Sequence, residues 1–252
     1  MKRARYVLMV LSGKGGVGKT TVAVNLASAL AHGHRVGLLD ADLHGPNVPK
    51  MLGLEGATLR VHNNKILPAV TPDNLLVVSL EFALPSADAP VIWRGPLKMK
   101  AIQQFVEDVD WGELDLLVVD LPPGTGDEPL SVAQLLAPVD GALIVATPQE
   151  VAILDARKAV NFAREVGVQK IGVVENMAGL RCPHCGGEIK LFGEGGAEKM
   201  AKEMGIEFLG RLPFFPEVVA AGDKGKPLAF SGETREAFLA LAEKVWEFLE
   251  GS

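Results

Sequence analysis

The chain has 252 residues, of which 48% are apolar and 22% charged, which is ordinary usage for one large α/β domain or two small ones. A net charge of −6 without a basic stripe argues against a nucleic-acid partner. The apolar run Tyr6–Leu11 behind the basic start is too short for a signal peptide, and no stretch is long and apolar enough to span a bilayer. We therefore expect a cytoplasmic protein without a nucleic-acid or membrane partner.

Short apolar runs rich in β-branched residues alternate along the chain with longer segments of helical period. The predicted strands are Tyr6–Leu11, Arg35–Leu39, Leu75–Leu80, Leu114–Val119, Gly141–Ala146, Lys170–Val174 and Phe208–Gly210. The predicted helices are Thr20–Ala31, Glu150–Val166, Gly195–Met204 and Glu233–Leu249. Continuous apolar strands suit burial on both faces, and their alternation with helices implies a parallel sheet covered on both sides. We predict an α/β fold, doubly wound around a mainly parallel sheet, as a single domain over residues 1–252.

The loop between the first predicted strand and helix fits the pattern G-x-x-x-x-G-K-[ST] at every fixed position, in the context that this motif requires. Its residues are Gly13, Lys14, Gly15, Gly16, Val17, Gly18, Lys19 and Thr20. The glycines let backbone N–H groups converge on phosphate oxygens, and the helix that follows points its positive end at the same place. We predict that the loop binds ATP, with Lys19 at the β and γ phosphates and the Thr20 hydroxyl on Mg²⁺.

Carboxylates end two of the predicted strands. A nucleotide hydrolase needs a carboxylate that holds Mg²⁺ and a group that orients the attacking water. Asp120 follows the apolar strand Leu114–Val119, as a Walker B metal ligand does, and the glycine-rich segment behind it suits a loop that senses the γ-phosphate. Asp40 and Asp42 follow Arg35–Leu39, and separate roles at the nucleotide are open to them. The alternative is a strand-end turn in which both cap local N–H groups.

Two further segments interrupt the alternation of strands and helices. Thr58–Ala69 contains Asn63-Asn64 between apolar residues, which favours a small hairpin. The segment at about 179–190 looks like an insertion between a strand and a helix, and it carries both cysteines of the chain.

Cys182 and Cys185 lie three positions apart and do not form a disulfide framework. In a cytosolic chain such a pair is more often metal-binding or redox-active. A redox C-x-x-C normally opens a helix, whereas here the next predicted helix begins well downstream. One pair is half of a four-thiolate site, and a two-fold dimer can supply the other half. Four thiolates suit [4Fe–4S] or Zn²⁺, and we expect His184 between them to point away.

The run KGGVGKTT, from Lys14 to Thr21, resembles the deviant Walker A loop of the family that includes the Min division ATPase, nitrogenase iron protein, the ParA partition ATPases and the Mrp/ApbC iron–sulfur carriers. In that family the early lysine reaches across a dimer interface to the partner's nucleotide. The resemblance implies a homodimer, catalytic roles for Lys14 and Lys19, and nucleotide contacts along the whole run. The alternative for Lys14 is a solvated surface lysine.

The same resemblance assigns roles to residues outside the loop. It implies that Asp40 lies near Mg²⁺ and its waters, that Asp42 orients the attacking water, and that Asn176 contacts adenine. A turn-forming asparagine is the alternative for Asn176. The run LPFFPE after Arg211 is either a second wall of the base pocket or a rigid packed loop.

Several longer runs narrow the resemblance to the Mrp/ApbC/Nbp family of ATP-binding iron–sulfur carriers. They are DADLHGPNVPKMLG, VIWRGPLK, DLPPGTGD, CPHCG and LPFFPEV, and the coverage extends from about Tyr6 to Phe230. This resemblance implies a P-loop NTPase with slow ATPase activity, whose homodimer bridges a labile [4Fe–4S] cluster through Cys182 and Cys185. It also implies ATP-dependent transfer of the cluster to apo-proteins. The chain begins almost at its first strand, so the short, core-only form is expected.

Two other functions stay open on the sequence. One is a zinc-stapled dimeric ATPase of the same fold. The other is a Min- or Par-like positioning ATPase. The acidic polar face of the tail after Glu233 argues against it, because acidic residues disfavour binding to anionic lipid. The acidic residues are Glu236, Glu243, Glu247 and Glu250. The loop Trp93-Arg94-Gly95-Pro96 before a helix is a candidate partner contact without an assigned role.

Overall fold

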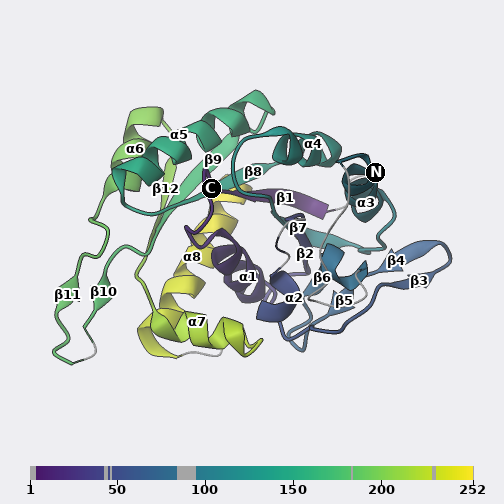
Figure 1. The fold of residues 1–252 in the computed structure, drawn as a ribbon, viewed down its shortest axis with the longest axis horizontal. Helices are drawn as coiled ribbons and strands as arrows, with labels where there is room; N and C mark the ends of the chain where they lie inside the picture. The colour runs from purple at the N-terminus through teal and green to yellow at the C-terminus, as the bar shows by residue number, and fades with distance from the viewer. Residues whose placement is uncertain are drawn as a thin grey trace.

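The computed structural model describes residues 4–42, 45, 47–83, 95–182, 184–228 and 231–251. An eight-stranded sheet forms the centre of this part of the chain, and helices cover both of its faces (Figure 1). Trp93 and Arg94 of the candidate partner loop lie outside the described residues, whereas Gly95 and Pro96 already belong to the helix that follows.

The strands are β1 (Ala4–Leu11), β2 (Val36–Asp40), β3 (Arg60–His62), β4 (Lys65–Leu67), β5 (Ala69–Val70), β6 (Leu76–Ser79), β7 (Leu114–Asp120), β8 (Gly141–Ala146), β9 (Lys170–Asn176), β10 (Leu180–Arg181), β11 (Glu188–Ile189) and β12 (Glu207–Leu212). The α-helices are α1 (Lys19–Leu30), α2 (Val48–Met51), α3 (Gly95–Glu107), α4 (Asp127–Leu136), α5 (Glu150–Glu165), α6 (Gly196–Met204), α7 (Pro216–Asp223) and α8 (Gly232–Glu250), and a 3₁₀ turn covers Leu80–Ala83. Every strand and helix predicted from the sequence is present, and no boundary differs by more than two residues.

The strand order of the large sheet is β12-β9-β8-β1-β7-β2-β6-β5. All neighbours are parallel except β5, which pairs antiparallel with β6 at one edge. Strands that follow β1 in the sequence lie on both sides of it. The direction in which the chain adds strands to the sheet therefore reverses at β1. This confirms the predicted doubly wound, mainly parallel sheet. In such sheets ligands bind beyond the carboxyl ends of the strands, at the point of reversal.

Two hydrophobic cores flank the sheet, because successive side chains of a buried strand point to opposite faces. Met9 and Leu11 of β1 pack into the core under α3, α4, α5 and α6. Leu8 and Val10 pack into the core under α1, α2, α7 and α8. The two helix layers are separate in Figure 1, with α8 crossing behind α1. Among the described residues, none of the helices has the length and apolar character to cross a bilayer.

Two small hairpins lie outside the large sheet. Asn63 and Asn64 join β3 to β4 with φ values of 49° and 59°, the left-handed conformation that asparagine tolerates in a tight turn, so the predicted hairpin is confirmed. The second hairpin, β10–β11, is formed by the segment between β9 and α6, and it projects from the body of the molecule (Figure 1). The two cysteines lie between its strands.

Candidate functional site

The phosphate loop joins the end of β1 to the start of α1, at the point where the strand order reverses. Gly16 and Gly18 have φ values of 81° and 83°, which residues with a Cβ rarely adopt. A Cβ added at Gly15 or Gly16 would meet no described atom within 4 Å, so the space over the loop is open. The first turn of α1 carries no acidic residue, and among the described residues no side chain caps it. Its free N–H groups therefore fit a phosphate.

The phosphate loop packs tightly on the side that faces α5 and the end of β9. A Cβ at Gly13 would lie 2.1 Å from the backbone oxygen of Asp155 in α5. A Cβ at Gly18 would lie 2.3 Å from Nδ2 of Asn176, and this amide donates a 2.8 Å hydrogen bond to the carbonyl of Val17. Asn176 is thus a buried support of the loop in this structure, and its contact with adenine stays a prediction.

Three side chains meet where the loop approaches the end of β7. Lys19 Nζ donates to Asp120 Oδ1 at 2.5 Å, and the Thr20 hydroxyl donates to Asp120 Oδ2 at 2.6 Å. Asp120 is fully buried and Lys19 is nearly so. The burial raises the pKa of Asp120, although Lys19 and Thr20 oppose the shift.

Asp40 lies beside Asp120 because their strands are neighbours and the two residues are partners in register. Its Oδ2 accepts a 2.9 Å hydrogen bond from the Ser79 hydroxyl, and its Oδ1 accepts one from the backbone N–H of Asp42 at 3.2 Å. Burial first, and then the charge of Asp120, raises the pKa of Asp40 well above its usual range. Carboxylate and hydroxyl oxygens in such a cluster are the donors that Mg²⁺ prefers, and a cation would offset their repulsion, so the residues fit this metal.

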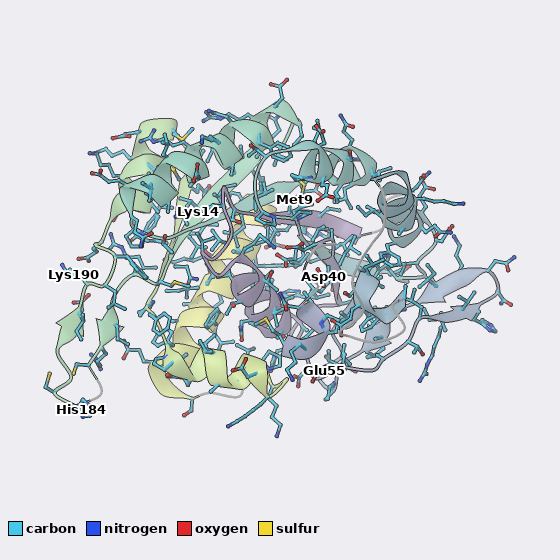
Figure 2. All side chains as sticks on the ribbon, in the orientation of Figure 1. Met9, Lys14, Asp40, Glu55, His184 and Lys190 are labelled. Atoms are coloured by element: carbon cyan, nitrogen blue, oxygen red, sulfur yellow. The ribbon has the colours of Figure 1, made fainter. Side chains whose placement is uncertain are left out.

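The remaining predicted nucleotide residues lie around this cluster. Lys14 is half-buried in the loop, and Ser12 donates to its carbonyl at 3.0 Å. Thr21 lies in the first turn of α1, and its carbonyl accepts a hydrogen bond from Asn25. Asp42 is half-buried just beyond β2. Figure 2 shows Lys14 well apart from His184, which lies at the tip of the cysteine hairpin.

The cysteine pair occupies a separate site at this tip. The backbone N–H of Cys182 donates to Gly187 at 2.8 Å, and Gly186 donates back to Cys182 at 2.9 Å, which closes the loop. Both cysteines are free, Cys185 is exposed, and Cys182 is partly exposed. Hydrogen bonds from the backbone N–H groups of His184 and Cys185, and then from the Cys185 thiol, lower the pKa of Cys182. The thiolate, which is the metal-binding form, is therefore favoured there.

The two cysteines of the hairpin do not make a complete metal site by themselves. In the part of the chain that the structure describes, no group of three or more histidine, cysteine or acidic side chains is arranged to hold a metal ion. Two soft thiolates fit an iron–sulfur cluster or zinc, and both of these take four protein ligands at such a site. A cleft of about 860 Å³ separates the hairpin from the start of α7 and α8, and Cys182, Phe214, Phe215 and Thr234 line it. The LPFFPE run thus lies at the root of the cysteine hairpin.

Some polar residues of these sites were not predicted from the sequence. Ser79 donates a hydrogen bond to Asp40, and one feature of the sequence could have indicated it: Ser79 is the polar residue in the apolar run Leu75–Leu80. Glu175 is fully buried next to Asn176, and it pairs with Arg211 on β12. A charge inside a buried strand is the signal that could have marked it.

Comparison with known proteins places these sites in a family. The profile of the ParA family described as NUBPL iron-transfer P-loop NTPase matches residues 3–246. The iron-sulfur cluster carrier protein of Methanocaldococcus jannaschii is 47% identical, over 100% of this chain and 87% of its own length. The protein of the same name from Pyrococcus horikoshii is 50% identical, over 97% of this chain and 86% of its own length.

Solved structures agree with this assignment. A nucleotide-binding protein in complex with ADP, from Archaeoglobus fulgidus, has a TM-score of 0.81 at 38% identity, over 94% of this chain and 93% of that one. The MinD cell division protein of Aquifex aeolicus has a TM-score of 0.70 at 26% identity, with 96% of each chain covered. From the profile and the identity to the carrier proteins together, we conclude that the chain belongs to the NUBPL iron-transfer family of P-loop NTPases.

Proposed function

We propose that this protein is an ATP-dependent iron–sulfur cluster carrier that acts as a homodimer in the cytoplasm. The observation that carries the proposal is the pair of free thiols on a projecting hairpin of a P-loop NTPase. Its relatives named iron-sulfur cluster carrier protein support it. The cargo is a labile [4Fe–4S] cluster, and the recipients are apo-proteins that lack their cluster.

The residues around the phosphate loop have distinct tasks in this proposal. Lys19 leaves Asp120 and binds the β and γ phosphates when ATP enters. Thr20 and Asp120 hold Mg²⁺, which neutralises the charge that develops on the phosphates. Asp40, held by Ser79, orders the waters around the metal. Asp42, two residues beyond Asp40, orients the attacking water.

A second copy of the chain completes both sites. Lys14 lies half-buried in the loop, and in the proposed dimer it reaches the partner's nucleotide. The cysteine hairpin offers two thiolates, so two chains supply the four that a [4Fe–4S] cluster requires. An exposed tip suits a carrier, because a recipient protein can approach the cluster directly. Slow hydrolysis then links the state of the dimer to retention or release of the cargo.

The test is anaerobic reconstitution of the metal-free protein with iron and sulfide. We expect about four irons and four sulfides per dimer, with the visible absorbance of a [4Fe–4S] protein. Cys182→Ala and Cys185→Ala should lose the cluster, whereas His184→Ala is the matched control within the same loop and should retain it. Incubation with an apo-enzyme that needs a cluster should then restore its activity.

Other outcomes would refute the proposal. Cysteine variants that hold the cluster as well as the wild type would remove its basis. Protein purified without oxygen that contains only zinc, and takes up no cluster, would identify a zinc-stapled ATPase. Binding to anionic vesicles would favour a positioning ATPase, although the exposed acidic residues of α8 argue against it. These are Glu236, Glu243, Glu247 and Glu250.

A further inference from the structure

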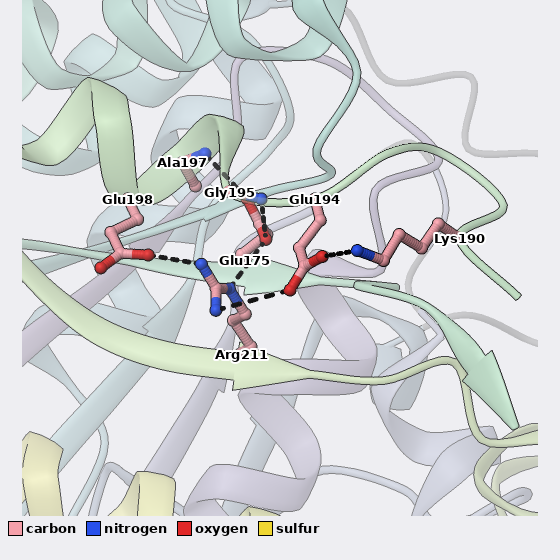
Figure 3. A network of polar contacts seen from close by, with 7 residues as sticks. All are labelled: Glu175, Lys190, Glu194, Gly195, Ala197, Glu198 and Arg211. Atoms are coloured by element: carbon pink, nitrogen blue, oxygen red, sulfur yellow. Dashed lines mark hydrogen bonds and ion pairs between the residues drawn. The ribbon is translucent and has the colours of Figure 1, made fainter. Parts of the chain in front are cut away.

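A cluster of charged residues is built on a buried glutamate, Glu175, and extends through Arg211 and Glu194 to Lys190 (Figure 3). Glu175 is fully buried at the end of β9. The backbone N–H groups of Gly195 and Ala197, at the start of α6, donate to its two carboxylate oxygens at 2.9 and 2.8 Å. A buried charge is costly unless it is paired and hydrogen-bonded, so these contacts hold the carboxylate in one place.

Arg211 is the cation that pairs with this carboxylate, and its side chain is partly exposed at the surface. It lies on β12, in register with Glu175, and its Nε donates to Glu175 Oε1 at 3.2 Å. Its other guanidinium nitrogens pair with Glu198 of α6 and, at 3.8 Å, with Oε1 of Glu194. A planar guanidinium can serve several carboxylates in fixed directions at once, which the single ammonium of a lysine cannot do.

Glu194 extends the contacts to the hairpin. Its Oε2 pairs with Lys190, and this pairing raises the pKa of Lys190 and lowers that of Glu194. Lys190 directly follows β11, which pairs with β10 next to Cys182. The ion pairs therefore hold the segment through which the chain leaves the cysteine hairpin (Figure 3).

The inner end of the cluster meets the phosphate loop. Asn176 follows Glu175 in β9, and its side chain donates to the carbonyl of Val17. The other strand of the hairpin is also attached here, because the N–H of Phe214, just beyond β12, donates at 2.7 Å to Gly179, just before β10. The ends of β9 and β12 thus contact both the nucleotide loop and both sides of the hairpin root.

We propose that Arg211 is a positioning residue that couples the nucleotide state of the phosphate loop to the orientation of the cysteine hairpin. This rests on the proposed function, in which one chain uses both sites. A shift of Val17 on phosphate binding moves Asn176 and therefore Glu175. Arg211 follows that carboxylate and displaces Glu194 and Lys190, at the exit of the hairpin.

The test measures how fast an alkylating reagent modifies the two cysteines of the metal-free, full-length protein. The rate is compared without nucleotide, with ADP and with a non-hydrolysable ATP analogue, each with Mg²⁺. We compare wild type, Arg211→Gln and the matched control Arg157→Gln. Arg157 pairs with Glu203 across α5 and α6, and its side chain is 34% exposed against 37% for Arg211.

We expect the ATP analogue to change the alkylation rate about fivefold or more in wild type and in Arg157→Gln. In Arg211→Gln the rate should be the same in all nucleotide states, while nucleotide affinity stays close to that of the control. Arg211→Lys should restore only part of the response, because it cannot bridge the carboxylates.

A second pair of variants follows the route of coupling and covers the case in which Arg211→Gln does not fold. Glu194→Gln should lose the response, since Glu194 links Arg211 to Lys190, whereas Glu198→Gln, on α6, should keep it. A full response in Glu194→Gln, or a wild type whose alkylation rate ignores nucleotide, would overturn the proposal. A wild type that responds to nucleotide but takes up no cluster would instead refute the proposed function and leave the coupling intact.

Discussion

The phosphate loop and the cysteine hairpin are built in opposite ways. The loop lies over the centre of the large sheet, and its glycines fit within a few ångströms of α5 and Asn176. The hairpin has strands of two residues each, projects from the body, and faces a cleft of about 860 Å³ at its root. A phosphate site needs N–H groups fixed in advance, whereas the proposed function requires the hairpin to be reachable by another protein.

The difference predicts that damage to one region leaves the other region's own chemistry intact. Communication between them then depends on the few residues that contact both. These residues lie at the ends of β9 and β12. The proposed coupling through Arg211 is therefore the route by which one region would affect the other.

The largest expected effect is on hydrolysis in Lys19→Ala. Lys19 is the buried cation beside Asp120, and its loss should lower ATP turnover about 100-fold or more. Cluster uptake on reconstitution should be unchanged, because the thiols lie elsewhere. Steady-state phosphate release and iron content, measured on the same preparation, check both halves. A variant that loses the cluster along with the activity would show that the two regions are not independent.

Next in size is the effect of packing under the loop. Gly18→Ala places a Cβ 2.3 Å from Asn176 at a φ of 83°, so we expect the free energy of unfolding to fall by about 2 kcal/mol. Gly15→Ala is the control, since its Cβ would meet no described atom within 4 Å. Urea unfolding of both variants decides the point, and equal stability would mean that the loop is less tightly supported than the structure shows.

Lys14→Ala should have a smaller effect on turnover, about tenfold, because it removes one charge from the phosphates and leaves the rest of the loop. Lys14 is only half-buried, so stability should change little. The cluster content should match that of the wild type. Unchanged ATP turnover would count against a role between two chains and favour a solvated surface lysine.

The smallest expected effect is on stability in Asp40→Asn. The pKa of Asp40 is raised in the folded protein, so its contribution favours folding at low pH and is lost as the pH rises from the unfolded toward the folded pKa. Without nucleotide, the asparagine variant should be about 1 kcal/mol more stable than wild type near neutral pH. The gain should vanish in acid. Thermal unfolding of both proteins from acid to neutral pH tests this prediction. A gain in stability that persists in acid would exclude the Asp40 charge as its cause.

Much of the fold follows from local patterns in the sequence. The buried strands were predicted because short apolar runs alternate with helical segments, and the β3–β4 turn because Asn63 and Asn64 tolerate positive φ. Helix α2 spans four residues, too few to show a period, and α4 and α7 were not predicted separately. The packing of these short helices against the sheet stabilises them more than their own sequences do.

The sequence by itself identified the phosphate loop and the C-x-x-C pair, because each motif is defined by neighbouring residues. The tertiary structure alone decided their surroundings. It brought Ser79 into hydrogen-bond contact with Asp40, Asn176 with the carbonyl of Val17, and Arg211 with Glu175. Each of these contacts joins residues on different strands or loops. They form only when the parallel sheet brings the strand ends to one edge, and no local pattern specifies which side chains meet there.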